Sequence, residues 1–185
     1  MARASVRLIV ALRETALSLE REATVYRWSR FAHCNCGHLA QTITGLAPGT
    51  IEAAAKRHPG DWGEQARTLC GPRLRPVLDQ NSPTIEDALE PEELDVCNVT
   101  GQTMPQIIAT LFAWGLEPAD VEALERLSDS AVRRRLGTNT IDFPHGQRQN
   151  VIAYLRAWAD LLEEKLPPNA RAGDEQGASY LLAAE

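Results

Sequence analysis

Side chains able to bind a metal or to act as nucleophile and base gather in one segment, His33-Cys34-Asn35-Cys36-Gly37-His38. Thiolates bind zinc, copper(I) and iron–sulfur clusters, and imidazole also binds zinc and copper. The segment therefore predicts a bound metal ion or iron–sulfur cluster, zinc or iron, with a structural or redox role. The candidate ligands are the four cysteines of the chain and the two histidines of the segment: Cys34, Cys36, Cys70, Cys97, His33 and His38.

The spacing of the C-x-C pair restricts where such a site can form. Helical side chains two residues apart point about 200° apart, so both thiols reach one metal only in a loop or at a helix start. We expect the pair just before a helix at residues 39–44, where Gly37 supplies backbone freedom. The strong zinc pattern, two C-x-x-C pairs, is absent from the sequence. Cys70 and Cys97 are therefore open to a second interpretation, as small buried hydrophobic residues.

A thiol-dependent enzyme is the second hypothesis, with Cys36 as the nucleophile. A helix N-terminus stabilises a thiolate and lowers the thiol pKa. His38, His33 or His145 would serve as the base, and Cys34 as a resolving thiol. The sequence has no local signature of a cysteine hydrolase, so this enzyme is an alternative to the metal site.

A helical protein-interaction module with a purely structural cysteine site is the third hypothesis. The acidic surface, with a formal net charge of −6, and the C-terminal tail would then be the functional parts, binding a basic protein partner or docking on a second copy of the chain. Nucleic acid and anionic lipid need a positive surface, so neither is expected as a partner. Three adjacent arginines at residues 133–135 predict a solvated helix face, because neighbouring helical side chains fan out.

Familiar cofactor motifs are absent from the sequence. It contains no Walker loop, no dinucleotide fingerprint and no C-x-x-C-H haem pattern. It also lacks the E-x-x-H repeat of di-iron helical bundles. The cysteine and histidine segment is thus the one chemical feature that the sequence singles out.

Composition and periodicity predict an all-α fold around this segment. Only 5% of the 185 residues are aromatic, whereas Ala and Leu, which favour helices, are abundant. We expect one domain at 1–168, a bundle of about six to eight helices, followed by a flexible tail at 169–185. Asp61 and Ser128 are expected to cap the helices that follow them. An irregular excursion is predicted at 71–83. Helices are predicted at residues 5–28, 39–44, 51–57, 62–70, 105–114, 118–127, 129–136 and 145–166, with two short ones at 84–89 and 91–96.

The tryptophans and the N-terminal apolar run complete the expectations. Trp28, Trp62, Trp114 and Trp158 are predicted to lie in helices and pack in the core, with Trp28 also shielding the cysteines. The apolar run at residues 6–12 is short and charged residues follow it, so no secretory signal is expected. No stretch reaches the roughly 20 apolar residues of a membrane span. We therefore expect a cytoplasmic protein without a membrane partner.

Overall fold

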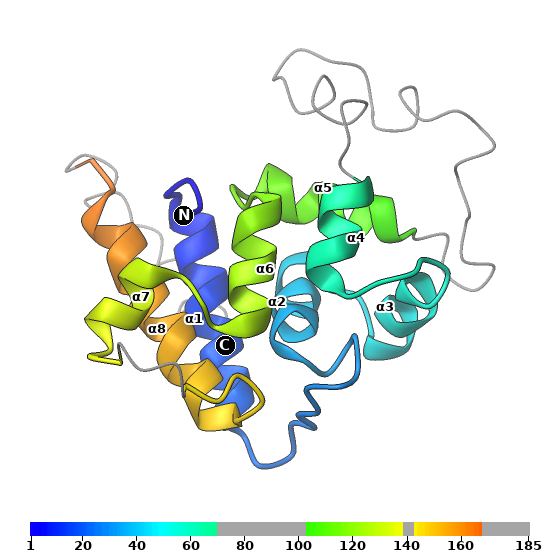
Figure 1. Ribbon diagram of the computed structural model, residues 1–185, viewed down its shortest axis with the longest axis horizontal. Coiled ribbons are helices and arrows are strands. Elements are labelled where there is room, and N and C mark those ends of the chain that lie inside the picture. The colour runs from blue at the N-terminus through cyan, green and yellow to red at the C-terminus, as the bar shows by residue number, and fades with distance from the viewer. Residues whose placement is uncertain (70–102, 139–142, 168–185) are drawn as a thin grey trace, which may run out of the picture.

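The computed structural model describes residues 1–69, 103–138 and 143–167, which form eight helices and no strand (Figure 1). The predicted all-α class is confirmed. The predictions for 71–83, 84–89, 91–96 and the tail lie outside the described residues. In chain order the helices are α1 (Val6–Glu20), α2 (Asn35–Thr44), α3 (Pro48–Ala55), α4 (Trp62–Leu69), α5 (Met104–Ala113), α6 (Pro118–Arg126), α7 (Ser130–Arg135) and α8 (Arg148–Glu164).

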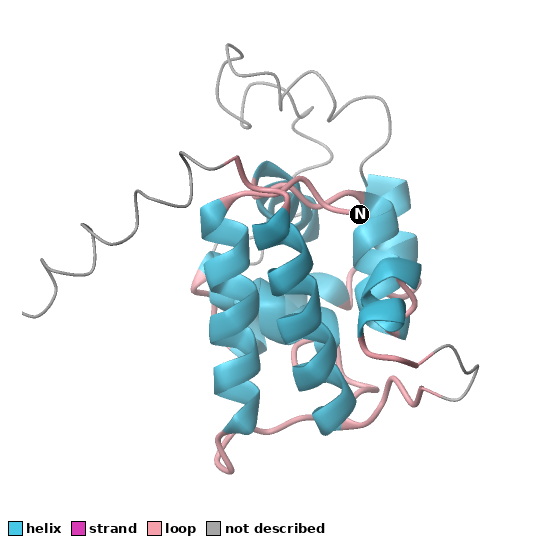
Figure 2. Cartoon of the chain, turned by 90° about the vertical axis from the view of Figure 1, so that its left-hand side faces the viewer, coloured by secondary structure: helices cyan, strands magenta, loops and turns pink. Residues whose placement is uncertain are grey.

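The two longest helices, α1 and α8, pack side by side and form one face of the molecule (Figure 2). Each buries an apolar stripe, which includes Leu12 of α1 and Leu155 of α8, both fully buried. Arg13 bridges the seam with ion pairs to Asp160 (3.1 Å) and Glu163 (2.7 Å) of α8. Hydrophobic burial provides the stability of this pair, since half-exposed ion pairs contribute little.

Helix α2 lies at the centre of the fold and packs against α1, α3, α5 and α6. All of its residues from Asn35 to Ala40 are buried. A helix buried on every side must satisfy its polar side chains within the protein, because water cannot reach them. Residues 34–38 of the cysteine and histidine segment therefore lie in the interior, whereas His33 is only partly buried.

Two helix ends differ from the sequence-based expectation. Helix α1 ends at Glu20 instead of continuing to Trp28, and the chain then forms a loop at residues 21–34. The Thr24 hydroxyl donates to the Ser18 carbonyl (2.6 Å), a side-chain cap with no Gly or Pro to signal it. Helix α2 begins at Asn35, four residues before the predicted start at Leu39.

Two further helix starts also differ, since α3 begins at Pro48 and not at residue 51, and α8 begins at Arg148 and not at residue 145. Several other helix ends agree with their sequence signals. Asp61 precedes α4, and its carboxylate accepts the Glu64 N–H (2.8 Å), as its predicted capping role requires. Pro118 opens α6 as predicted, and α2 ends at Gly45 in the left-handed conformation (φ 69°). The cap of α7 is Asp129 and not the predicted Ser128.

Within the three described ranges, no helix has both the length and the apolar character needed to cross a membrane.

Candidate functional site

The two neighbouring thiols point to different parts of the fold. Cys34 is the residue that precedes α2, and Cys36 lies in the first helical turn. The Cys34 thiol donates to the Phe31 carbonyl in the preceding loop (3.2 Å). The Cys36 thiol donates to the Val121 carbonyl of α6 (3.4 Å). The helix starts early enough to separate the pair, as expected for helical residues two apart.

Both thiols are buried and protonated at neutral pH. Burial raises the pKa of Cys34 to about 12 and the pKa of Cys36 well above its usual value. The nucleophile hypothesis requires the opposite shift, toward a stable thiolate. Burial deprives a thiolate of water and raises the thiol pKa by more than the N–H groups at the helix N-terminus lower it.

The two histidines bind the same backbone carbonyl. His33 Nδ1 and His38 Nε2 each lie 3.2 Å from the Val25 oxygen, and both must carry a proton because a carbonyl only accepts. Burial lowers the pKa of His38 to about 4, so its ring is neutral at pH 7. The histidines thus tie the loop at residues 21–34 onto α2.

Asn35, between the two cysteines, is a site residue that the sequence reasoning missed. Its fully buried amide nitrogen faces three carbonyls, those of Leu124 (3.1 Å), Glu125 (2.9 Å) and His145 (3.3 Å). Its oxygen accepts the Tyr26 hydroxyl (2.7 Å). Leu124 and Glu125 lie in the last turn of α6, where carbonyls run out of the regular helical partners, although the Leu124 oxygen also accepts the Leu127 N–H (3.3 Å). Asn35 therefore caps α6 from another helix, and no local pattern indicates such a contact.

Gly37 is required by close packing and not by an unusual backbone angle. A Cβ atom at this position would overlap the Phe31 carbonyl oxygen and lie 2.5 Å from the Ala32 carbonyl carbon. The backbone at residues 31–32 crosses directly over the first turn of α2. The sequence assigned Gly37 to a flexible turn, whereas the structure uses it as the contact between loop and helix.

The described residues do not assemble the predicted metal ligands. No group of three or more His, Cys, Asp or Glu side chains in these ranges is placed to hold a metal ion. Each candidate ligand is hydrogen-bonded to a backbone carbonyl instead. His33 and His38 share the Val25 oxygen, Cys34 donates to Phe31 and Cys36 donates to Val121. Cys70 and Cys97 lie outside the described residues, so their participation stays a prediction.

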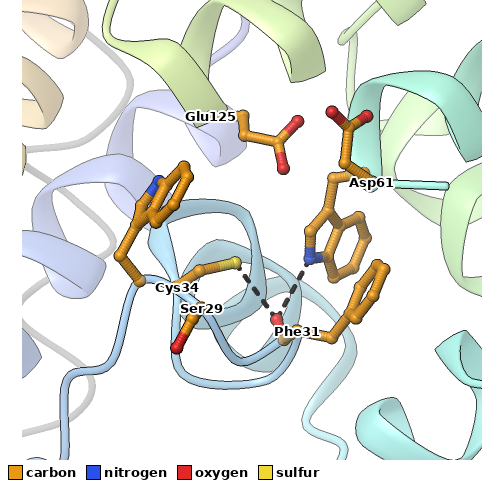
Figure 3. A pocket seen from close by; sticks show the side chains of 7 residues that line it. Ser29, Phe31, Cys34, Asp61 and Glu125 are labelled. Carbon is orange, nitrogen blue, oxygen red and sulfur yellow. Dashed lines mark hydrogen bonds between the residues drawn. The ribbon is translucent and has the colours of Figure 1, made fainter. Parts of the chain in front are cut away.

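A small pocket opens beside Cys34, with a volume of about 160 Å³ (Figure 3). In Figure 3 the carboxylates of Asp61 and Glu125 lie across the pocket from Cys34. Three segments far apart in the sequence supply its walls: the loop before α2, the start of α4 and the end of α6. The lining residues are Trp28, Ser29, Phe31, Cys34, Asp61, Trp62 and Glu125.

Aromatic side chains form much of the pocket wall. Trp62 is buried, and its indole N–H donates to the Phe31 carbonyl (3.0 Å), the oxygen that also accepts the Cys34 thiol. The Phe31 and Trp62 ring centroids lie 6.0 Å apart. Trp28 is 45% exposed and packs against His145 (centroids 4.7 Å apart). The prediction that Trp28 is a core residue of a helix is wrong, because the chain has already left α1.

The two pocket carboxylates are anchored by backbone amides at the start of α4. Glu125 accepts the Gly63 N–H (3.2 Å), and Asp61 accepts the Glu64 N–H. Burial raises the pKa of Glu125, and the negative charge of Asp61 adds to that shift. The sequence assigned Asp61 a capping role and gave Glu125 none, since nothing local brings α6 to α4.

Comparison with protein-family models, curated proteins and solved structures finds no match for this chain. Its function has to be inferred from its own residues.

Proposed function

We propose that this protein is a helical binding module whose recognition site is the pocket beside Cys34. The observation that carries the proposal is an open pocket with an exposed tryptophan, Trp28, at its rim. Tryptophan is highly buried on average in folded proteins and is enriched among the residues that dominate binding energy at interfaces. This function needs neither thiol to ionise, in keeping with the raised pKa values of Cys34 and Cys36.

The size of the pocket limits what it can hold. A cavity of about 150 Å³ accommodates benzene, whereas pockets for drug-sized ligands run from about 300 to 1,000 Å³. At about 160 Å³ the pocket suits a compact molecule or the end of one side chain. A nucleotide is too large for this pocket, and only a small part of it could enter.

The cysteine and histidine segment supports this proposal by holding the pocket wall in place. His33 and His38 fasten the loop through Val25, three residues before Trp28. Arg148 of α8 donates to the Thr24 carbonyl of the same loop. A wall that is already ordered loses little conformational entropy when a ligand binds. We therefore assign the segment a positioning role.

Chemical-shift mapping with compact fragments tests the proposal. Benzyl alcohol, benzoate and benzylammonium would each be titrated into the 15N-labelled protein. The expected result is saturable shifts at the amides of Ser29, Gly63 and Glu125 with at least one fragment, because these residues lie in or against the pocket wall.

Two variants make this test specific to the pocket. Trp28→Ala removes an aromatic wall and should weaken the binding. Leu17→Ala is the matched control, since Leu17 is an exposed hydrophobic residue of α1 and does not line the pocket. Absence of pocket shifts with all three fragments, or equal binding by Trp28→Ala and wild type, would contradict the proposal.

A further inference from the structure

We infer that the group bound in this pocket is an organic cation of the alkylammonium class. The inference rests on the pocket being a recognition site, and it names the chemistry of the ligand. It follows from three properties of the walls: which hydrogen-bonding groups they offer, what charge they carry and which surfaces surround that charge.

The polar wall groups left for a ligand are mainly acceptors. The Trp62 indole N–H and the Cys34 thiol are donors, but both point to the Phe31 carbonyl (3.0 and 3.2 Å). Among the other lining side chains, Asp61 and Glu125 present carboxylate oxygens, which only accept when ionised. The Ser29 hydroxyl can donate or accept, and the Trp28 indole N–H can donate. Both charged groups of the wall are therefore acceptors, so a carboxylate or phosphate would meet like charge and a cation is favoured.

The charge on the pocket floor is only partly compensated by the protein. Arg126 lies 3.7 Å from Asp61, but it is also 4.0 Å from Glu122 and points toward solvent. Among the described residues no basic side chain lies within ion-pair distance of Glu125, whose carboxylate accepts the Gly63 N–H instead. A cation bound between the rings would balance the charge of Glu125.

The aromatic walls select an organic cation over a metal ion. Trp28, Phe31 and Trp62 line the pocket, and aromatic ring faces attract cations, with tryptophan the strongest of the three ring types. Alkylammonium groups gain apolar contact with the same rings, as quaternary ammonium ligands do in aromatic cages. Magnesium and calcium bind through oxygen ligands and keep polar coordination shells, so they gain no apolar contact from the rings that line this pocket.

A pair of isosteric probes separates charge from shape. Choline and 3,3-dimethyl-1-butanol differ only in a quaternary nitrogen replaced by carbon. We expect choline to shift the Ser29, Gly63 and Glu125 amides and to bind at least about fivefold more tightly than the alcohol, the scale of a cation–π contact plus one partly exposed charge pair. A peptide with one trimethyllysine, compared with choline, distinguishes a protein-borne cation from a free one.

Two charge variants complete the experiment. Glu125→Gln keeps an oxygen for the Gly63 N–H and should weaken choline binding without changing the affinity for the alcohol. Glu14→Gln, an exposed position on α1, removes the same charge elsewhere and should leave choline affinity unchanged. Equal binding of both probes would overturn the cation inference and leave the binding module standing. Failure of both probes and of the three benzyl fragments would overturn the binding module as well.

Discussion

At the scale of single residues, the segment at residues 33–38 acts through hydrogen bonds to backbone carbonyls. His33 and His38 donate to Val25, and the two thiols donate to Phe31 and Val121. Residue types suited to metal binding or catalysis are also neutral donors when buried, and local sequence cannot tell these uses apart. The sequence correctly identified where unusual side chains gather, but their partners are set by elements distant in the chain.

Asn35 provides the clearest test at this scale. Asn35→Ala leaves the carbonyls of the last turn of α6 without their buried donor, so we expect a loss of about 2–4 kcal/mol in the free energy of unfolding. Asn150→Ala is the matched control, because the Asn150 amide bonds Pro144 at the surface and should cost under about 1 kcal/mol. Urea denaturation measures both. Equal effects of the two substitutions would contradict the buried cap.

His38 should make stability depend on pH. Its pKa is about 4 in the fold and 6.5 when unperturbed, so between these values the unfolded state takes up a proton that the folded state does not. The free energy of unfolding should therefore fall as the pH is lowered from 6.5 to 4, by no more than about 3 kcal/mol from this group. Denaturation of wild type and His38→Gln at several pH values isolates the contribution. An identical pH dependence in the two proteins would exclude it.

At the scale of elements, helix ends marked by proline or glycine follow the sequence, whereas those set by tertiary contacts do not. Pro118 and Gly45 mark their ends because their backbone preferences act locally. The end of α1 at Glu20 and the start of α2 at Asn35 depend instead on side-chain caps and on the crossing loop. The apolar periodicity continues past Glu20 and resumes only at Leu39, so it makes α1 too long and α2 too short.

The crossing of the loop over α2 predicts a large effect at Gly37. Gly37→Ala should lower the free energy of unfolding by about 3 kcal/mol or more, because a Cβ would overlap the Phe31 carbonyl and force the loop away. Gly49→Ala is the control: it lies in α3 with no heavy atom within 4 Å of an added Cβ. That change should be neutral or stabilise by up to about 1 kcal/mol. Thermal unfolding of both variants measures these changes. A loss of stability in Gly37→Ala no larger than that in Gly49→Ala would contradict the close crossing.

At the scale of the whole molecule, the pocket exists only because the loop before α2, the start of α4 and the end of α6 meet. Trp28, Asp61 and Glu125 are far apart in the chain, and no periodic or spacing signal joins them. Fold class was predictable because composition and helical period act throughout the chain. The pocket was not, since its walls belong to three elements whose packing is a long-range property. The cysteines nevertheless directed attention to its wall, because Cys34 is part of it.

We propose that the cysteine segment holds the wall of a recognition pocket and is not itself a reactive centre. Cys36 separates the two accounts, because the metal and nucleophile hypotheses both require its thiolate, whereas it does not line the pocket. Cys36→Ser keeps a donor for the Val121 carbonyl and should cost about 1–2 kcal/mol of stability at this buried position.

The decisive measurement is a benzylammonium titration of wild type and Cys36→Ser, followed at the pocket amides, with metal content determined on both samples. If the segment only positions the pocket wall, both proteins bind benzylammonium saturably and their dissociation constants agree within about twofold. Loss of one contact to the ligand would change the dissociation constant by more than that. Stoichiometric zinc or iron in the wild type, lost together with ligand binding in a folded Cys36→Ser protein, would contradict the positioning role.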